Sequence, residues 1–284
     1  MTLCRNHFWS ALPPIALRGV GTGLVESTMT YVLRLSDVSG VPVPSIRGQI
    51  AKMIDRPATF SPDEPGYDAS VRALEILSGT DGLARGSLRW VSNVIRQRSI
   101  SSEGKRRKWC PLCYLEWNDD SFEPLVWSMD LLDHCPVHKP AIERECPFCG
   151  AEQLNGTPYA HRRGCRECNE PLGRRTDTCS HTRYRQWVEQ QVMDLVELCA
   201  TAGKATLPDD TFKSYLCALE QTARTMPSVP IGLKDAFSRW KANSERVRRV
   251  ELRTLINLCS LQAIPLTKVL LDPIGSAGAP VLDF

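Results

Sequence analysis

Four pairs of cysteine and histidine residues in the middle of the chain have the spacing of metal ligands. Each pair has two residues between its members, and the pairs are Cys110 with Cys113, Cys135 with His138, Cys146 with Cys149, and Cys165 with Cys168. A tight turn of this kind presents two ligands from one loop, and two turns together supply the four tetrahedral ligands that zinc prefers. The sequence therefore predicts two zinc ions per chain. We favour pairing of the turns in sequence order over a crossed arrangement.

Both predicted metal sites are closed, which favours a structural role. Catalytic zinc keeps one coordination position open for water, whereas each set here offers four protein ligands. In so small a module the metal replaces a hydrophobic core, and it contributes an apparent folding free energy on the order of 10 kcal/mol. We therefore expect no catalytic residues and no enzyme activity. A nuclease of the His-Asn-His type is an alternative, but His134 and His161 lack the Asn and His residues that complete its signature.

The 12 cysteines also bear on the compartment. A disulfide scaffold would suit an exported protein, but no apolar signal-peptide core follows Met1, and the apolar runs are short and broken by charge. We therefore expect a cytoplasmic, nucleoid-associated protein without membrane contact, in which paired cysteines hold metal. The unpaired Cys4, Cys199, Cys217 and Cys259 are expected to be small buried hydrophobic residues.

Three units follow from the distribution of these residues. We predict an N-terminal helical unit over residues 1–104, a central double zinc-knuckle or zinc-ribbon module over 105–182, and a C-terminal helical domain over 183–284. The length of 284 residues allows two or three compact units, since single domains are typically about 100–150 residues long. The expected fold class is mainly α.

In the N-terminal unit, the spacing of apolar residues predicts two short helices. Ser27 has the position of an N-cap for a helix through Tyr31 and Leu35. Apolar residues between Val71 and Leu77 predict another helix, which ends before the turn at residues 79–82.

In the C-terminal domain, we expect a bundle of four or five helices. An apolar stripe runs from Tyr184 to Cys199, and segments 212–219, 233–240 and 247–259 have the same periodicity. The last segment and the turn at Ile264 suit a helix-turn-helix as well as plain bundle packing.

Basic residues are concentrated on both sides of the first ligand set. Residues 85–108 contain eight Lys or Arg side chains against one acid, and apolar spacing from Leu88 to Ile95 predicts a helix within this segment. A second cluster around the last cysteine pair consists of Arg162, Arg163, Arg166, Arg174, Arg175, Arg183 and Arg185. Each cation that contacts a phosphate adds salt-dependent affinity, although a solvated surface explains any single arginine equally well. We predict nucleic-acid contacts by Arg89, Arg96, Lys105, Arg106, Arg107, Lys108, Arg162 and Arg163.

The connector between the first two turns, residues 111–133, has the opposite charge. It contains six acidic residues and no Lys or Arg, with Tyr114, Trp117, Phe122 and Trp127 among them. Aromatic anchors surrounded by charge are typical of protein interfaces. We predict that Trp117, Asp119, Asp120 and Phe122 bind a protein partner; the alternative is that Trp117 and Trp127 pack onto the zinc turns.

The motifs occur in an order that points to a known family. They are Trp109-Cys-Pro-Leu-Cys113, an acidic connector that contains Trp127, then Cys135-Pro-Val-His-Lys-Pro140 and Cys146-Pro-Phe-Cys-Gly150. Earlier in the chain stand Glu26-Ser27, Tyr31 and Arg34-Leu35-Ser36. This series resembles the TniQ/TnsD family of transposon target-selection proteins, although Val25 stands where the family usually has proline.

The resemblance implies a non-catalytic adaptor in DNA transposition. Such a protein marks a target by binding DNA itself or by joining a CRISPR surveillance complex with its guide RNA, and it recruits a TnsC-type AAA+ ATPase. The alternative is a zinc-containing DNA-binding transcription regulator, which needs no ATPase. The net charge of +3 by itself implies no partner, and a homodimer is left open.

Overall fold

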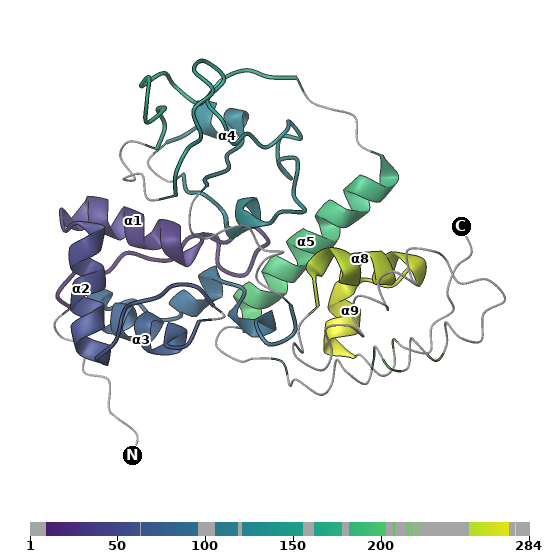
Figure 1. The fold of residues 1–284 in the computed structure, drawn as a ribbon, viewed down its shortest axis with the longest axis horizontal. Helices are drawn as coiled ribbons and strands as arrows, with labels where there is room; N and C mark the ends of the chain where they lie inside the picture. Colours follow the sequence, from purple (N-terminus) through teal and green to yellow (C-terminus); the bar gives the residue numbers. More distant parts are fainter. Residues whose placement is uncertain are drawn as a thin grey trace.

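The computed structural model describes residues 10–62, 64–95, 106–118, 121–155, 162–177, 182–202 and 250–272, with the single positions 207, 215, 217, 221 and 276. Within these residues the regular elements are helices, and β-structure is limited to isolated bridges, so the mainly α fold class is confirmed. Figure 1 shows three helices on one side, the cysteine-rich region above them, and a long helix that runs past the C-terminal helices towards the N-terminal part. No helix among the described residues is long and apolar enough to span a bilayer.

The N-terminal unit consists of α1 (Thr28–Ser39), α2 (Val43–Ile54) and α3 (Tyr67–Ser78), with α2 packed against both neighbours. The helices predicted at α1 and α3 are confirmed. Ser27 caps α1, because its Oγ accepts a hydrogen bond from the Thr30 N–H at 3.0 Å. The bridge between Glu26 and Pro124 places this capped end next to the cysteine-rich region.

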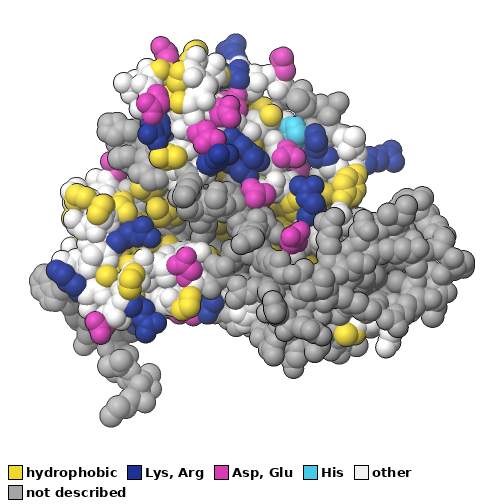
Figure 2. Space-filling model, in the orientation of Figure 1, with side chains coloured by type: hydrophobic (Ala, Val, Ile, Leu, Met, Phe, Trp, Pro, Cys, Tyr) yellow, Lys and Arg dark blue, Asp and Glu magenta, His cyan; other side chains and the backbone are white. Residues whose placement is uncertain are grey.

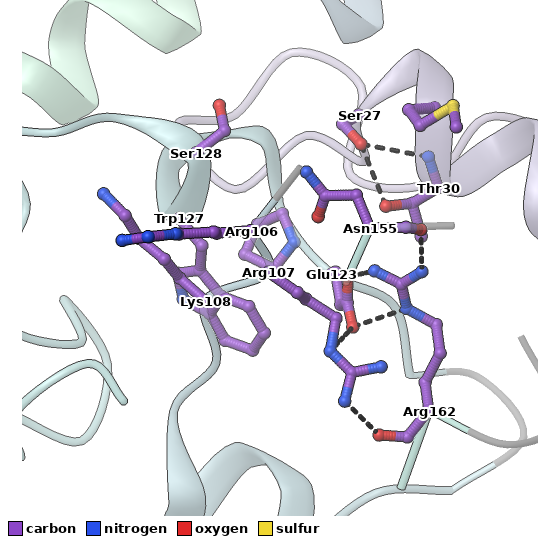
Figure 3. A pocket seen from close by; sticks show the side chains of 12 residues that line it. Ser27, Thr30, Arg106, Arg107, Lys108, Glu123, Trp127, Ser128, Asn155 and Arg162 are labelled. Carbon is purple, nitrogen blue, oxygen red and sulfur yellow. Dashed lines mark hydrogen bonds and ion pairs between the residues drawn. The ribbon is translucent and has the colours of Figure 1, made fainter. Parts of the chain in front are cut away.

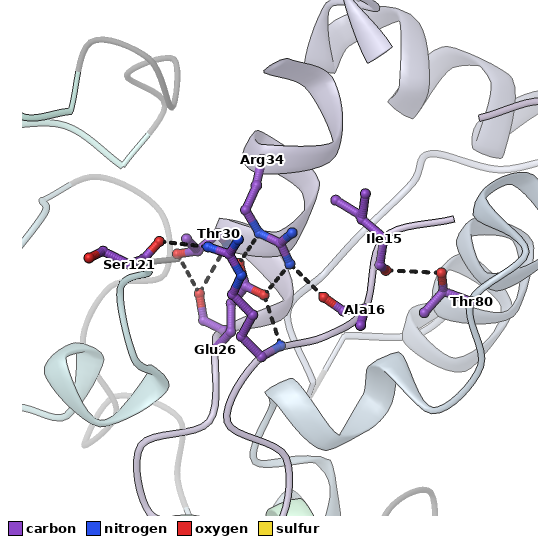
Figure 4. A network of polar contacts seen from close by, with 9 residues as sticks. Ile15, Ala16, Glu26, Thr30, Arg34, Thr80 and Ser121 are labelled. Carbon is purple, nitrogen blue, oxygen red and sulfur yellow. Dashed lines mark hydrogen bonds and ion pairs between the residues drawn. The ribbon is translucent and has the colours of Figure 1, made fainter. Parts of the chain in front are cut away.

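A buried ion pair ties α1 to the residues around it (Figure 4). Glu26 is fully buried, and Arg34 of α1 donates to both of its carboxylate oxygens, with Nε at 2.9 Å and Nη2 at 2.7 Å. The same Nη2 also donates to the Ala16 carbonyl at 2.7 Å. Arg18 donates to Glu26 through its backbone N–H and to the Ser121 carbonyl through Nη1. The presence of Glu26 and Arg34 in the TniQ-like motif therefore has a structural explanation, since each of the two buried charges is the partner of the other.

Residues 83–95 differ from the continuous helix that the sequence predicted over 88–95. They form two short 3-10 helices, η1 (Leu83–Gly86) and η2 (Arg89–Val91), and then a turn. The predicted apolar positions are buried, but Ile95 leaves the helical path because it pairs with Val250, whose N–H donates to the Val94 carbonyl at 2.8 Å. A contact with a segment far along the chain therefore overrides the local periodicity.

The long helix α5 (Arg183–Ala202) joins the parts of the molecule. It packs against η1 and η2, against η4 (Leu125–Ser128) of the acidic connector, and against the C-terminal helices. The hydrophobic core is continuous across these contacts, with Val192, Leu195 and Cys199 of the predicted stripe buried in it.

Two further helices, α8 (Leu252–Leu261) and α9 (Leu266–Leu271), follow each other across a short turn. Their apolar faces pack into the bundle, and the Leu266 N–H donates to Gln191 of α5 at 2.7 Å. The helix-turn-helix stays a prediction, since bundle packing explains the same contacts. The predicted segments at 212–219 and 233–240 lie outside the described residues, apart from positions 215 and 217.

Candidate metal centres and the surfaces around them

Three of the four ligand turns share one backbone geometry. They start at Cys135, Cys146 and Cys165, and in each the first cysteine N–H donates to the carbonyl five residues later, at 2.8 to 2.9 Å. The carbonyl of that cysteine accepts from the N–H four residues later, at 2.9 Å. The residue at this fourth position has a left-handed φ of 59 to 72°, and it is Lys139, Gly150 or Asn169. Each turn therefore aims two ligand side chains at one point.

The remaining turn, which is the first along the chain, forms the start of helix α4 (Pro111–Leu115). Cys110 has the N-cap position, its Sγ accepts from the Cys113 N–H at 3.4 Å, and Pro111 occupies the first helical position, where its missing N–H has no cost. One half of the first set is therefore helical, whereas both halves of the second set are tight loops.

The first set consists of Cys110, Cys113, Cys135 and His138, whose ligand atoms lie within 4.8 Å of one another. The Sγ atoms of Cys113 and Cys135 are 3.7 Å apart, and His138 Nδ1 lies 3.1, 3.8 and 4.0 Å from the three sulfurs. A tetrahedron with zinc–sulfur bonds of about 2.3 Å has edges of about 3.8 Å. His138 Nε2 lies 3.1 Å from the Glu116 carboxylate, which orients the ring with Nδ1 towards the sulfurs.

The second set consists of Cys146, Cys149, Cys165 and Cys168, again within 4.8 Å. Two of its sulfur–sulfur distances are 3.6 and 3.7 Å, close to the same tetrahedral edge. Gln153 Nε2 donates to the Cys165 sulfur at 3.3 Å. The structure thus brings the four turns together in sequence order, as two groups that could each hold a metal ion.

One thiol in each set has a lowered pKa. Hydrogen bonds from the Cys110 and Cys113 thiols lower the pKa of Cys135 to about 2. Burial raises the pKa of Cys165, but the N–H groups of Cys168 and Glu167 outweigh it and lower that pKa to about 6. The thiolate is the form that binds metal, so a lowered thiol pKa favours metal binding.

A buried charge cluster joins the two sets (Figure 3). Glu123 of the acidic connector accepts from Arg162, with Nε at 2.7 Å and Nη2 on the second oxygen, and from the Tyr114 hydroxyl. Arg107 Nε lies 3.9 Å from the same carboxylate. Burial would raise the pKa of Glu123, but Arg162 and Arg107 outweigh it, and the pKa is lowered. Sequence reasoning missed this cluster, whose one signal is an acid between the apolar neighbours Phe122 and Pro124.

Three residues predicted to contact nucleic acid are instead part of the interior. Arg107 and Arg162 are 1% exposed and Lys108 is 6% exposed. Lys108 Nζ donates to the Met129 carbonyl at 3.1 Å and to Asp130 at 3.0 Å, and burial lowers its pKa. We expected these three side chains on a surface that contacts phosphate. They are buried instead, because folding brings carboxylates beside them.

The other predicted nucleic-acid residues are divided. Arg89 pairs with Asp68, with Nε at 3.0 Å, and the exposed Arg106 lies 3.0 Å from Glu152. Arg163 is exposed, while Arg96 and Lys105 lie outside the described residues. Figure 2 shows Lys and Arg side chains interspersed with acidic ones over the face in view.

The predicted partner residues surround a cavity beside the first set. Trp117 and Phe122 are half-buried and line a volume of about 290 Å³, together with Cys113, Val137 and other residues. Trp127 also lines it but is itself 3% exposed and packs near Tyr114, with ring centroids 6.1 Å apart, so it belongs to the core. Asp119 and Asp120 lie outside the described residues.

Comparison with known families adds to this geometry. Residues 17–142 match the family model described as TniQ. Over this part, which is less than half of its length, the chain is similar to the TniQ family. The TniQ match includes α1 to α3 and all four ligands of the first set, but neither the second set nor α5. It confirms the resemblance noted in the sequence and implies a function associated with transposition, whereas no curated protein matches the chain.

Proposed function

We propose that the chain is a non-catalytic target-selection adaptor in DNA transposition that holds two Zn²⁺ ions and recruits a TnsC-type AAA+ ATPase. The observation that carries this proposal is the TniQ match over residues 17–142, which coincides with one packed body of three helices and a closed ligand set. Zinc would serve here to hold the turns together, because all four donors of each set come from the protein.

The cavity beside the first ligand set supports a protein partner. The described residues that line it include Trp117, Phe122 and Val137 but no Lys or Arg, and the Glu116 side chain beside them is 66% exposed. A partner with an apolar anchor and basic neighbours would fill the cavity and pair with Glu116, Asp119 and Asp120.

For nucleic acid, the proposal rests on the exposed members of the basic clusters. Arg106 and Arg163 are exposed, and Arg96 and Lys105 belong to the same stretches of sequence. An exposed ion pair such as Arg106 with Glu152 contributes little, so Arg106 can exchange it for a phosphate. Target choice would follow either from such DNA contacts or from a CRISPR surveillance complex with its guide RNA.

Capture of a TnsC-type ATPase by the purified protein tests the proposal. We expect wild type to capture it, and the charge-reversed variant Asp119→Lys/Asp120→Lys to lose most of the captured ATPase. Glu197→Lys, on an exposed position of α5, is the matched control and should behave as wild type. Metal content should be equal in all three proteins. Equal capture by the reversed variant would place the interface elsewhere, and DNA binding without any capture by wild type would favour the transcription regulator.

A further inference from the structure

A groove separate from both ligand sets lies where α5 begins. It has a volume of about 220 Å³ and is lined by residues of α5 and α8 and by Leu131 and Asp133 of the acidic connector. Its polar lining side chains are Asp133, Thr182, Tyr184, Arg185, Arg253 and Asn257. Residues far apart in the sequence therefore contribute to one polar groove.

The two arginines of this groove differ from those near the ligand sets. Arg162 and Arg174 have carboxylate partners, whereas Arg185 and Arg253 are exposed and form no ion pair in the part of the chain that the structure describes. With Asp133 as the acid among the lining residues, the groove has a net positive charge. Unpaired arginines that share a groove suit an anionic ligand.

Tyr184 gives the groove an aromatic face. It belongs to the apolar stripe predicted for this helix, yet it is 54% exposed. Its hydroxyl donates to Asn257 Oδ1 of α8 at 2.7 Å, and its ring stacks on Trp187 with centroids 6.4 Å apart and an angle of 23°. The ring is thus held from two sides while half of its surface stays open.

We propose that this groove binds single-stranded nucleic acid, with one base stacked on Tyr184 and the adjoining phosphates on Arg185 and Arg253. Proteins that bind single strands combine a positive groove with aromatic side chains on which bases stack. The bases of a duplex are already stacked on each other, so they cannot use the face of Tyr184. The inference deepens the proposed function and rests on its nucleic-acid association, but it places the contact on residues other than those predicted from the sequence.

Fluorescence anisotropy with labelled oligothymidylate, oligouridylate and a DNA duplex of equal length tests the groove. In Arg185→Ala/Arg253→Ala we expect the salt dependence of single-strand binding to fall by about 1.4, since each phosphate contact in a single strand contributes about 0.7. Tyr184→Ala should weaken single-strand binding on the order of tenfold with little change in salt dependence, because stacking carries no charge. Tyr184→Phe keeps the ring and should bind nearly as wild type does.

The controls separate the groove from general charge and from the adaptor role. Lys52→Ala/Lys268→Ala removes two exposed cations elsewhere and should leave the single-strand affinity and its salt dependence unchanged. An unchanged salt dependence in the arginine variant, or duplex binding that weakens as much as single-strand binding, would overturn the proposal. The ratio of oligouridylate to oligothymidylate affinity shows whether RNA or DNA is the ligand. Variants that lose the oligonucleotide but capture the ATPase support the groove, whereas a wild type that binds the oligonucleotide but not the ATPase overturns the adaptor alone.

Discussion

The two candidate metal centres have nearly the same ligands but different surroundings. In the first, Cys110 and Cys135 are fully buried, one turn is the start of a helix, and the neighbouring connector packs against the N-terminal unit through the bond from the Leu125 N–H to the Val25 carbonyl. In the second, Cys146 and Cys165 are buried too, but Cys149 and Cys168 are exposed, whereas Cys113 of the first is half-buried. The first centre lies within the TniQ match and the second lies after it.

This difference teaches that equal ligand spacing does not imply an equal structural role. Each centre contributes two cysteines to the hydrophobic core, but the connector of the first also packs against the N-terminal unit, so the packing of α1 to α3 depends more on the first centre. The second centre clamps a short peripheral segment, which the Glu123–Arg162 pair attaches to the rest. Five experiments test this comparison.

Loss of a ligand should affect the two centres unequally. Cys135→Ser should unfold most of residues 17–142, because a structural zinc contributes on the order of 10 kcal/mol and a whole domain has a stability of only about 5–15 kcal/mol. Cys165→Ser should bind one zinc fewer and keep the helical circular dichroism of α1 to α3. Metal analysis and thermal unfolding measure both. A Cys165→Ser protein that is as unfolded as Cys135→Ser, or that still holds two ions, would contradict the comparison.

Zinc removal by a colorimetric chelator should proceed in two phases. The fast phase corresponds to the second centre, because the sulfurs of Cys149 and Cys168 are open to attack, and the slow phase follows opening of the core. Cys165→Ser should lack the fast phase and retain the slow one. A single phase in wild type would show that the two centres release metal together.

The buried ion pair of Glu123 and Arg162 should contribute less to the free energy of unfolding than a metal ion does, but more than an exposed ion pair. Glu123→Gln should destabilise by about 3–5 kcal/mol, since it leaves Arg162 buried without its charge partner. Glu152→Gln, in the exposed pair with Arg106, should cost no more than about 1 kcal/mol. Urea unfolding at neutral pH measures both changes.

The same substitution predicts a pH dependence. Because the pKa of Glu123 is lowered on folding, its contribution is present above the unfolded pKa of about 4.3 and disappears as the pH falls through the lower folded pKa. The difference between wild type and Glu123→Gln should therefore be constant near neutrality and shrink in acid. Since both proteins contain the same metal ligands, a difference that grew in acid would reverse the sign assigned to this pair.

The smallest expected effect concerns the backbone contact between the centres. A Cβ at Gly173, just after the second centre, would lie 2.5 Å from the Leu115 backbone nitrogen of α4, so Gly173→Ala should cost about 1–3 kcal/mol. Gly48→Ala, in the interior of α2 where a Cβ meets no neighbouring atom, should stabilise by about 0.5–1 kcal/mol. Opposite shifts in unfolding temperature would confirm that the contact is close, and equal shifts would contradict it.

Much of the first centre could be predicted from the sequence, because the spacing of neighbouring residues determines which ligands a short turn presents. The Cys-x2-Cys and Cys-x2-His pairs, the N-cap at Ser27 and the order of the TniQ motifs all depend on residues a few positions apart. The same reasoning was wrong at residues 88–95, where a continuous helix was predicted but Ile95 pairs with Val250.

The sequence by itself thus determined the ligand pairs, the mainly α composition and the resemblance to the TniQ family over residues 17–142. Tertiary structure decided which charges are available: it buried Arg107, Lys108 and Arg162 around Glu123 and left Arg185 and Arg253 unpaired beside Tyr184 among the described residues. The physical reason is range. A turn or a cap needs neighbours within a few residues, whereas the environment of a charge depends on carboxylates that folding brings from distant positions, because a buried charge is stable only beside its partner.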